Sequence, residues 1–391
     1  MITFDDAFIK VVGAACQLGI ETVELSKALN RVLAENAFSD VNMPPFNKSA
    51  MDGFACRRKD LQNELTVIET IPAGIEPKKN ICENECSRIM TGAVVPKGAD
   101  CVIMFEFTEE TNGIVKFTGG KTSDNFCYKA EDIKNGDLVL NKGCLITPAV
   151  IAVLATIGYD KVKVATKPKV GIIATGSELI EPSEKRTGAK IRNSNGHQLC
   201  AQTIEMGAIA NYYGIAKDTH NAIDTAIKKA MSENNLVVLS GGVSMGDFDL
   251  VPEILENNDF NFFFDSVAMQ PGRPTIFGKH RSAGIFCCGL PGNPVSVFMV
   301  FATLLKPFLF KLMGCSIETV VIPLTLAKTI RRKKSVRQSS LPVKIENGKV
   351  IPIEYHGPAH INVMCLADGF IRIPVGTIEL AEGTIVNVRL I

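Results

Sequence analysis

The chain lacks an excess of charge of either sign, and this absence excludes several kinds of partner. Its 42 Lys and Arg residues nearly balance its 41 Asp and Glu residues, which leaves a formal net charge of +1 over 391 residues. A protein that binds nucleic acid or an anionic membrane through electrostatics carries a clear basic excess. The composition therefore predicts no nucleic-acid partner and no membrane partner.

Long apolar segments and a leader pattern are also missing. The longest apolar stretch, residues 295–310, is interrupted by Lys306 and Pro307 and is shorter than the roughly 20 residues that cross a bilayer. Asp5 and Asp6 stand where a signal peptide would carry positive charge. We therefore expect a cytoplasmic protein without a transmembrane span.

Signatures of several common enzyme classes do not occur. The 12 cysteines lack the paired spacing of a zinc ribbon, so we expect free thiols in a reducing compartment. The Gly-x-x-x-x-Gly-Lys-Ser/Thr loop of many nucleotidases is also absent. Function must therefore be inferred from where glycines and carboxylates follow the predicted strands.

The length predicts about two to four domains. Short strands and turn dipeptides, such as Asn112-Gly113 and Asn347-Gly348, mark β-rich segments on both sides of a region where buried strands alternate with helices. Uninterrupted apolar strands indicate a parallel sheet covered on both faces. The fold class is thus multidomain α/β plus β, with a central parallel-sheet domain, β-rich N-terminal domains and a C-terminal all-β, barrel-like domain. The predicted boundaries are 1–42 with 140–166, 43–139, 167–315 and 316–391.

Helices are expected where apolar residues recur at helical spacing. This pattern predicts helices at residues 5–18 and 22–34 in the first domain. Thr147 and Pro148 supply the cap and first-turn chemistry of another helix that runs to about residue 157. A long helix is predicted from Asn293 to about Met313.

Polar or glycine-rich clusters follow the predicted strands of the central domain. In parallel sheets, ligands bind at the carboxyl ends of the strands. Each cluster alone is weak evidence, because glycine and aspartate also serve ordinary turns. Together they predict one binding rim, formed by residues 176–178, 217–218, 241–249, 270–273 and 289–293.

Two of these clusters carry the sharpest signal. Residues 239–249 and 288–296 each follow an apolar run and place glycine where a backbone would approach a ligand. Asp247 and Asp249 are two apart, so in an extended loop both would face a divalent cation; the alternative for Asp249 is a helix cap. Asn293 and Pro294 open the long helix, whose free N–H groups attract anions. The pair of loops predicts phosphate and metal-ion chemistry.

Two further clusters lie in the β-rich segment. Residues 49–54 follow the Pro44-Pro45 bend, and residues 88–93 follow a polar stretch. From the residues alone these segments are turns, although their small residues with an acid or a hydroxyl would also suit a second binding rim.

With these segments in view, the chain resembles the molybdopterin molybdenumtransferase family (MoeA, and the corresponding part of gephyrin). The resemblance covers nearly the whole chain. The strings that carry it, in the family's order, are MPPFNKSAMDGF at 43–54, RIMTGA at 88–93, ATGSE at 174–178, SGGVSMGDFD at 240–249, QPGRP at 270–274 and GLPGNP at 289–294. The last strings alone would be less specific, because molybdopterin adenylyltransferases and competence-damage proteins share that domain type.

The resemblance implies a reaction and its setting. Members take adenylylated molybdopterin and molybdate, release AMP and leave molybdenum on the dithiolene sulfurs. They use a divalent cation, usually Mg²⁺, and form elongated homodimers of four-domain chains. The active site lies on the parallel-sheet domain and is completed at the subunit interface. Molybdoenzymes or their chaperones are the implied recipients of the product.

The resemblance also implies roles for individual residues. Glu178, Asp218 and Asp249 are the implied metal ligands, which would also orient an attacking oxygen of water or of molybdate. The implied catalytic residues are Asp52, Thr91, Asp132, Glu178, Asp218 and Asp249. The implied substrate-binding residues are Ser240, Gly241, Gly242, Ser244, Asp247, Arg273, Pro291, Gly292 and Asn293.

The chain departs from the family pattern chiefly at cationic positions. The departures are Ser266 and Gln270 for two lysines, Cys127 for an arginine, Ala130 for a glycine, and Ala359 and Pro342 near a serine and an arginine. Because molybdate is a dianion, fewer cations predict weaker molybdate binding unless other groups such as Arg88, Lys129 or Arg192 compensate.

Three alternatives stay open at the level of sequence. A tungstate-inserting relative would share every motif named above. An adenylyltransferase would use ATP with free molybdopterin. A non-enzymatic scaffold would bind partners through its β domains, although the acidic residues at the predicted rim argue against scaffolding alone.

Overall fold

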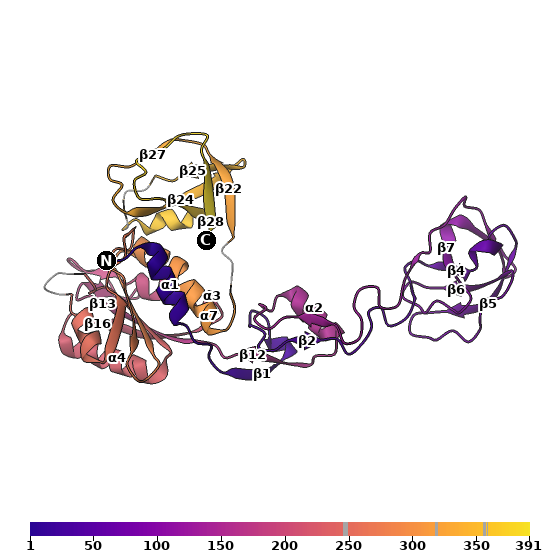
Figure 1. Cartoon of the computed structure of the whole chain (residues 1–391), viewed down its shortest axis with the longest axis horizontal. Coiled ribbons are helices and arrows are strands. Elements are labelled where there is room, and N and C mark those ends of the chain that lie inside the picture. The colour runs from indigo at the N-terminus through magenta and orange to yellow at the C-terminus, as the bar shows by residue number, and fades with distance from the viewer. Residues whose placement is uncertain (245–248, 317–319, 355–356, 358) are drawn as a thin grey trace. The chain divides into compact units, whose positions relative to one another are not determined.

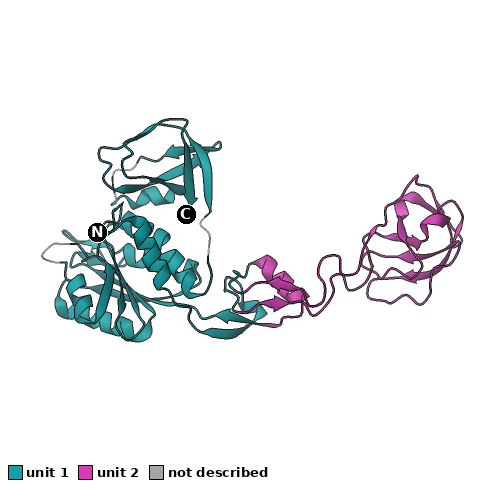
Figure 2. Ribbon diagram, viewed as in Figure 1, with its two compact units in different colours: residues 1–34, 143–147, 162–391 teal, residues 35–142, 148–161 magenta. Residues whose placement is uncertain are grey.

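The computed structural model describes residues 1–244, 249–316, 320–354, 357 and 359–391. The chain divides into two compact units (Figure 2). Unit 1 comprises residues 1–34, 143–147 and 162–391, and unit 2 comprises residues 35–142 and 148–161. The finer division into four domains stays a prediction.

The centre of unit 1 is a six-stranded sheet in the order β16-β13-β17-β21-β20-β18. The first four strands are parallel, as predicted, whereas β20 runs antiparallel to both of its neighbours. Consequently β18 points the same way as the parallel strands, and the connection from β18 to β20 lies at their carboxyl edge. The strands are β13 (Lys169–Thr175), β16 (Ile209–Ala216), β17 (Leu236–Ser240), β18 (Phe260–Phe264), β20 (Ile276–His280) and β21 (Phe286–Leu290).

Helices cover both faces of this sheet (Figure 1). Ile172 and Val238 belong to an apolar cluster that includes residues of α1, α3 and the long helix, whereas their neighbours Ile173 and Leu239 join a second cluster with α4 and α5. This alternation explains why the strands are apolar at nearly every position. The helices are α1 (Phe4–Ala14), α3 (Asn195–Glu205), α4 (His220–Glu233) and α5 (Val251–Asn257).

The long closing helix is confirmed as a core element. It comprises α6 (Pro294–Val300), a π-helical segment (Phe301–Leu305) and α7 (Lys306–Leu312). The π segment precedes Pro307, whose nitrogen has no hydrogen to donate to the helix ladder. Residues 294–312 are long and apolar enough to cross a membrane by composition, but 72% of that window is buried inside the protein. It is therefore the core helix of this unit.

The C-terminal part of unit 1 is a closed β-barrel, as predicted. Its sheet has the order β19-β24-β25-β22-β28-β26 and closes through pairing of β24 with β26. Asn347 (φ 50°) and Gly348 (φ 71°) form the predicted tight turn between β24 and β25. The strands are β19 (Met269–Gln270), β22 (Val321–Leu326), β24 (Gln338–Glu346), β25 (Lys349–Pro352), β26 (Gly369–Ile373) and β28 (Ile385–Leu390), with the short pair β23 (Ile330–Arg331) and β27 (Glu379–Leu380) beside them.

The helix predicted at residues 22–34 was wrong. Residues 20–24 form β1 (Ile20–Glu24), which pairs with β12 (Lys161–Ala165), and Leu33 makes an antiparallel bridge to Val164. β-branched residues favour extended structure, and here they find partners about 140 residues away in the chain. Tertiary pairing thus overrides a weak helical spacing.

Unit 2 contains a six-stranded sheet in the order β7-β4-β6-β5-β9-β8. Asn112 (φ 53°) and Gly113 (φ 78°) make the predicted hairpin turn between β8 and β9. The predicted helix after Thr147 is α2 (Pro148–Thr156). The strands are β4 (Gly53–Cys56), β5 (Leu65–Ile71), β6 (Glu85–Ile89), β7 (Cys101–Met104), β8 (Thr108–Thr111) and β9 (Ile114–Phe117), with the short pairs β2 (Ala37–Phe38) with β11 (Leu138–Leu140) and β3 (Lys48–Ser49) with β10 (Phe126–Cys127).

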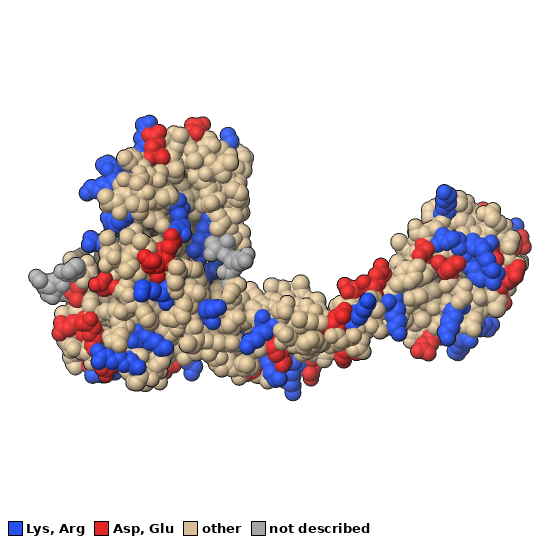
Figure 3. All heavy atoms as spheres, viewed as in Figure 1, with Lys and Arg blue, Asp and Glu red and all other residues tan. Residues whose placement is uncertain are grey.

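Charged side chains of both signs are mixed on each unit on the face drawn in Figure 3. This mixing agrees with the near-zero net charge.

Candidate functional site

A cavity of about 300 Å³ lies at the carboxyl edge of the central sheet; we call it the acidic cavity. It receives side chains or backbone from the ends of β13, β16, β17 and β21. The predicted site residues that line it are Glu178, Asp218, Ser240, Gly241, Gly242, Asp249 and Gly292. Four of the five clusters predicted to lie at the carboxyl ends of the strands therefore line one cavity.

Two of the carboxylates are positioned by the turn after β13. Ser177 N donates to Asp218 Oδ2 at 2.6 Å, and Asp218 N donates back to Ser177 Oγ at 3.1 Å. Gly176 (φ 151°) lies against the Glu178 carboxylate, because an added Cβ would lie 2.7 Å from it and would push Glu178 aside. The reciprocal bonds fix Asp218, while the missing side chain at Gly176 lets Glu178 fold back over the turn.

Glycine is required for different reasons at different positions of the two loops. Gly241 (φ 101°) and Gly242 (φ 64°) adopt left-handed backbone conformations, and an added Cβ at Gly241 would overlap the carbonyl oxygen of Thr175. Close packing of the protein therefore requires this glycine, whereas the sequence suggested close approach of a ligand. At Gly292 the nearest atom to an added Cβ is 3.9 Å away, so only here does the missing side chain leave backbone open to the cavity.

Asn195, at the start of α3, joins the two loops. Its Nδ2 donates to Ser240 Oγ at 2.8 Å and to the carbonyl oxygen of Gly292 at 2.7 Å. Its Oδ1 is buried and has no hydrogen-bond partner among the described residues. Sequence reasoning did not select Asn195 as a site residue, because nothing in a single chain shows that one amide reaches two loops about 45 and 97 residues away.

The acidic cavity suits a cation by its donor chemistry. Three carboxylates line it, and none of the described residues that line it is Lys or Arg. Asp249 directly precedes Leu250, the N-cap of α5, which makes no side-chain capping bond. The carboxylates do not converge into a complete cage: among the described residues, no three His, Cys, Asp or Glu side chains lie close enough to hold a metal ion together.

A second cavity, of about 700 Å³, shares Asp249 with the first; we call it the arginine cavity. The predicted residues Ser244 and Arg273 line it, and so does Ser266, the position of a lysine in the family pattern. Arg337 also lines it, and sequence reasoning did not select this residue.

The remaining predicted residues of the rim do not line either cavity. Pro291 is buried, and Asn293 is the N-cap of α6 but makes no side-chain capping bond. Asp247 lies outside the described residues. Of the candidate compensating cations, Arg192 donates to the carbonyl oxygen of Glu184 at 3.4 Å and lines neither cavity.

In unit 2, Asp52 and Thr91 meet. Asp52 Oδ1 accepts from Thr91 N at 2.6 Å and from Thr91 Oγ1 at 2.7 Å. These two donors lower the pKa of Asp52 below its ordinary value of 3.8. The carboxylate therefore stays ionised at neutral pH, which makes it a poor proton acceptor and a stable anchor for the Thr91 turn.

Asp132, the third residue of unit 2 that was predicted to be catalytic, lies in a different turn. Its backbone N donates to the carbonyl oxygen of Met43 at 3.0 Å, and its side chain is exposed. Ala130, where the family pattern has glycine, adopts φ 62°. An alanine in this conformation is strained, whereas a glycine would adopt it without that cost.

Arg88, another candidate cation, is already engaged. Its guanidinium is ion-paired with Glu110 and lies 5.0 Å from the Phe54 ring centroid and 5.2 Å from that of Phe105. Lys129 is exposed in unit 2. Arg88 is thus held within its own sheet by a carboxylate and two aromatic rings.

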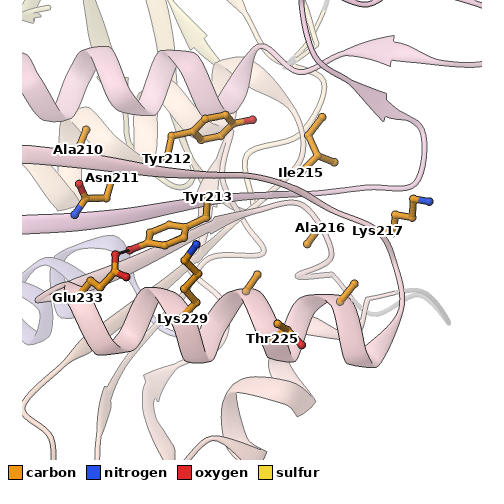
Figure 4. A pocket seen from close by; sticks show the side chains of 12 residues that line it. Ala210, Asn211, Tyr212, Tyr213, Ile215, Ala216, Lys217, Thr225, Lys229 and Glu233 are labelled. Atoms are coloured by element: carbon orange, nitrogen blue, oxygen red, sulfur yellow. Dashed lines mark hydrogen bonds between the residues drawn. The ribbon is translucent and has the colours of Figure 1, made fainter.

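Figure 4 shows a separate cavity of about 690 Å³ between the edge strand β16 and α4. Tyr213 Oη donates to Glu233 Oε2 at 2.6 Å, and Lys229 Nζ lies 5.8 Å from the Tyr213 ring centroid. These polar groups satisfy one another, and none of the predicted site residues lines this cavity.

Comparison with family models accounts for most of the chain. The model of the MoeA N-terminal region (domain I and II) matches residues 2–158, the probable molybdopterin binding domain matches residues 171–311, and the MoeA C-terminal region (domain IV) matches residues 325–391. The acidic and arginine cavities are built mostly from the second of these regions.

Named relatives and solved structures agree with these matches. A molybdopterin molybdenumtransferase of Staphylococcus epidermidis is 38% identical, with 94% of this chain and 90% of the relative covered. One of Staphylococcus aureus is 34% identical, with 100% and 95% covered. A molybdopterin biosynthesis MoeA protein from Pyrococcus horikoshii superposes over the full length of both chains with a TM-score of 0.85 at 30% identity. The chain therefore belongs to the molybdopterin molybdenumtransferase (MoeA) family.

Proposed function

We propose that this protein is a molybdopterin molybdenumtransferase of molybdenum cofactor biosynthesis. It takes adenylylated molybdopterin and molybdate, releases AMP, and leaves molybdenum on the dithiolene sulfurs. The observation that carries the proposal is the acidic cavity, which three carboxylates and two backbone loops line at the carboxyl edge of the sheet, in a chain of this family.

The two loops form the binding surface for the nucleotide phosphates. Gly241, Gly242 and Gly292 line the cavity, and at Gly292 the missing side chain leaves backbone open to it. The long helix that begins at Pro294 directs the positive end of its dipole toward this loop. Asn195 holds the loops at a fixed separation, so that both contact the same anion.

Mg²⁺ fits the donor set, because carboxylate oxygens are its preferred protein ligands. Asp218, Glu178 and Asp249 would hold it, with the substrate's phosphate oxygens completing the set that the protein leaves incomplete. When bound, this ion neutralises phosphate charge and polarises the phosphorus–oxygen bond that breaks. Without a cation, the same three carboxylates would repel an anionic substrate.

Asp249 has the position of a residue that orients the attacking oxygen. It lies on the wall shared by both cavities, so it faces the phosphate on one side and the arginine cavity on the other. If water attacks, the Asp249 carboxylate can accept its proton. If an oxygen of molybdate attacks, no proton need be removed and the carboxylate only positions the group.

The setting of the reaction is also part of the proposal. We expect a cytoplasmic homodimer that passes its product to molybdoenzymes or their chaperones. Family membership supports these expectations.

The direct test is release of AMP. Purified protein with adenylylated molybdopterin, molybdate and Mg²⁺ should release AMP in proportion to the molybdopterin that gains molybdenum. Omitting molybdate and omitting Mg²⁺ are the two controls. Absence of AMP release under the complete condition would contradict the proposed function, and turnover of ATP with free molybdopterin would identify an adenylyltransferase instead.

A further inference from the structure

We propose that the cavity between β16 and α4 is a docking groove for an extended, acidic segment of a partner protein, which adds as a strand to the edge of the central sheet. The cavity has a volume of about 690 Å³, with β16 on one side and α4 on the other (Figure 4). None of the described residues that line it lines the acidic or the arginine cavity. We call it the edge groove.

The backbone of β16 offers a free edge. Among the described residues, β13 is the only strand that pairs with β16. Ile209 N donates to the carbonyl oxygen of Pro168 at 2.8 Å, and the carbonyl oxygen of Ala216 accepts from Gly176 N at 3.2 Å, so both ends of β16 are bonded toward β13. Alternate residues of an edge strand direct their N–H and C=O groups away from the sheet. An added strand can bond to these groups.

A bulge limits how much of this edge can pair. Ile172 of β13 lies opposite Tyr212. Two residues further along β13, Ala174 lies opposite Ile215, so β16 contains one extra residue in this interval. Gly214 adopts φ 80°, and an added Cβ there would meet no atom within 4 Å, so this glycine serves the backbone conformation. Bulges protect edges against extended edge-to-edge pairing. The groove therefore suits a short segment rather than a long strand.

The helix wall of the edge groove consists of small side chains. Ala222, Thr225 and Ala226 stand at positions i, i+3 and i+4 and share one face of α4. Ile223 and Ile227 lie on another face, which is buried in the core. Every second side chain of an added strand would point toward the small residues. The wall thus leaves room for an apolar side chain of the partner.

Two lysines give the groove its preference for negative charge. Lys229 Nζ lies over the Tyr213 ring but has no acceptor or carboxylate partner among the described residues, and Lys217 also has none. Glu233, the one carboxylate among the described lining residues, accepts from Tyr213 Oη at 2.6 Å. In Figure 4, Thr225 lies between the two lysines. A partner segment with carboxylates on either side of an apolar residue would complement this pattern.

The probe is a fluorescein-labelled peptide, Thr-Glu-Thr-Val-Thr-Glu-Thr, titrated into the full chain and followed by fluorescence polarisation. In an extended strand its glutamates and its valine share one face, in the same pattern for either strand direction. We expect saturable binding that slows hydrogen exchange in residues 209–216. A peptide with lysine at both glutamate positions should bind about tenfold more weakly or worse. A peptide that is N-methylated at alternate residues keeps its charges but loses backbone donors, and should not bind.

Matched variants of α4 test the groove itself. Lys229→Met removes a groove cation and should weaken binding of the peptide about fivefold, the upper range for one exposed ion pair. Lys228→Met removes the same charge from the next position, where Lys228 pairs with Asp224 outside the groove, and should bind like the wild-type protein. Thr225→Phe places a ring in the groove from an exposed position and should weaken binding about tenfold or more.

Four results would overturn the inference. They are absence of saturable binding, equal binding of the N-methylated peptide, equal affinity in Lys229→Met and Lys228→Met, and protection of residues 209–216 that rises with protein concentration before peptide is added. The second would show charge attraction without strand addition, and the last would show that a second copy of this chain occupies the edge. None of these measurements uses AMP release, so failure of the proposed function would leave the docking groove intact.

Discussion

The rim of the central sheet and the Asp52–Thr91 pair of unit 2 are both built from residues distant in the sequence, but by different rules. In the parallel sheet every strand ends at the same edge, so each loop after a strand contributes to one place. In unit 2, β4 and β6 are antiparallel, with Gly53 opposite Ile89. Asp52 precedes one strand and Thr91 follows the other, so they meet only because these two strands pair.

The two regions differ in the number of chain segments that contribute to the site. At the sheet rim, many loops converge and a cavity forms with several carboxylates. In unit 2, one carboxylate is held by two hydrogen bonds from one residue. Loss of one side chain should therefore have large chemical consequences at the rim and smaller, more local ones in unit 2.

The strongest test of this contrast is Asp249→Asn. Because Asp249 lies on the wall of both cavities, its loss should lower the rate of AMP release by about 100-fold, the scale for removing one group that acts on the reacting atoms. Asp259→Asn is the matched control, since Asp259 is an exposed carboxylate of the same domain at φ 61°, which asparagine also tolerates. Equal rates in these two variants would remove Asp249 from the chemistry.

Substitution of Asn195 should have the next largest effect. Asn195→Ala removes the bonds to Ser240 and Gly292, so AMP release at saturating substrates should fall by about 30-fold, from roughly 1 kcal/mol for each of the two bonds lost.

Asn195→Asp separates positioning from simple loss of contacts. The new carboxylate cannot donate to the Gly292 carbonyl oxygen and adds negative charge to the acidic cavity, so its rate should fall below that of Asn195→Ala. Raising the Mg²⁺ concentration should restore part of the difference between the two variants. If both variants lose only thermal stability and keep the wild-type rate, Asn195 has a structural role alone.

Sequence reasoning located the site residues whose position follows from the topology of the sheet. It did not find the residues whose role depends on how far a side chain reaches. Apolar strands followed by glycine and acid were enough to place Glu178, Asp218 and Asp249 at one edge. Asn195 and Arg337 were missed because each acts across distant segments: one amide spans two loops, and one arginine arrives through the β19–β24 pairing. The pairing of β1 with β12 was missed for the same reason, since its partner strand lies far along the chain.

In unit 2, the contribution of Thr91 can be tested by measuring the pKa of Asp52. Thr91→Ala removes the hydroxyl donor, so the pKa of Asp52 should rise toward its ordinary value of 3.8, which carboxyl-carbon NMR measures directly. Since the folded-state pKa is depressed, the stabilisation by ionised Asp52 is present above 3.8 and is lost as pH falls through the folded value. The variant should therefore lose less stability on acidification than the wild-type protein.

The matched control for this titration is Thr91→Ser, which keeps the hydroxyl and should keep the lowered pKa of Asp52. AMP release in Thr91→Ala should fall by about fivefold, the kinetic equivalent of one hydrogen bond of roughly 1 kcal/mol. A loss as large as that of Asp249→Asn would break the contrast between the two regions, because it would show that unit 2 takes part in the reacting centre as strongly as the sheet rim does.

The smallest effect is expected at Ala130, and it is a gain. Left-handed backbone costs an alanine about 1–2 kcal/mol, whereas glycine loses about 0.5–1 kcal/mol through the entropy of the unfolded chain. Ala130→Gly should therefore raise the free energy of unfolding of unit 2 by about 1 kcal/mol, measured by denaturant titration. Ala73→Gly, at an exposed turn position without positive φ, should be destabilising instead.

Measuring the rate of AMP release in Ala130→Gly tests whether Ala130 affects activity as well as stability. Ala130 N donates to the carbonyl oxygen of Pro44 at 2.9 Å, and Asp132 N donates to that of Met43, so backbone bonds already hold the turn with alanine in place. Relief of strain should leave Asp132 where it is and leave the rate unchanged. A higher rate in Ala130→Gly would mean that the strained turn displaces Asp132 from its working position, and the family's glycine would then serve function as well as folding.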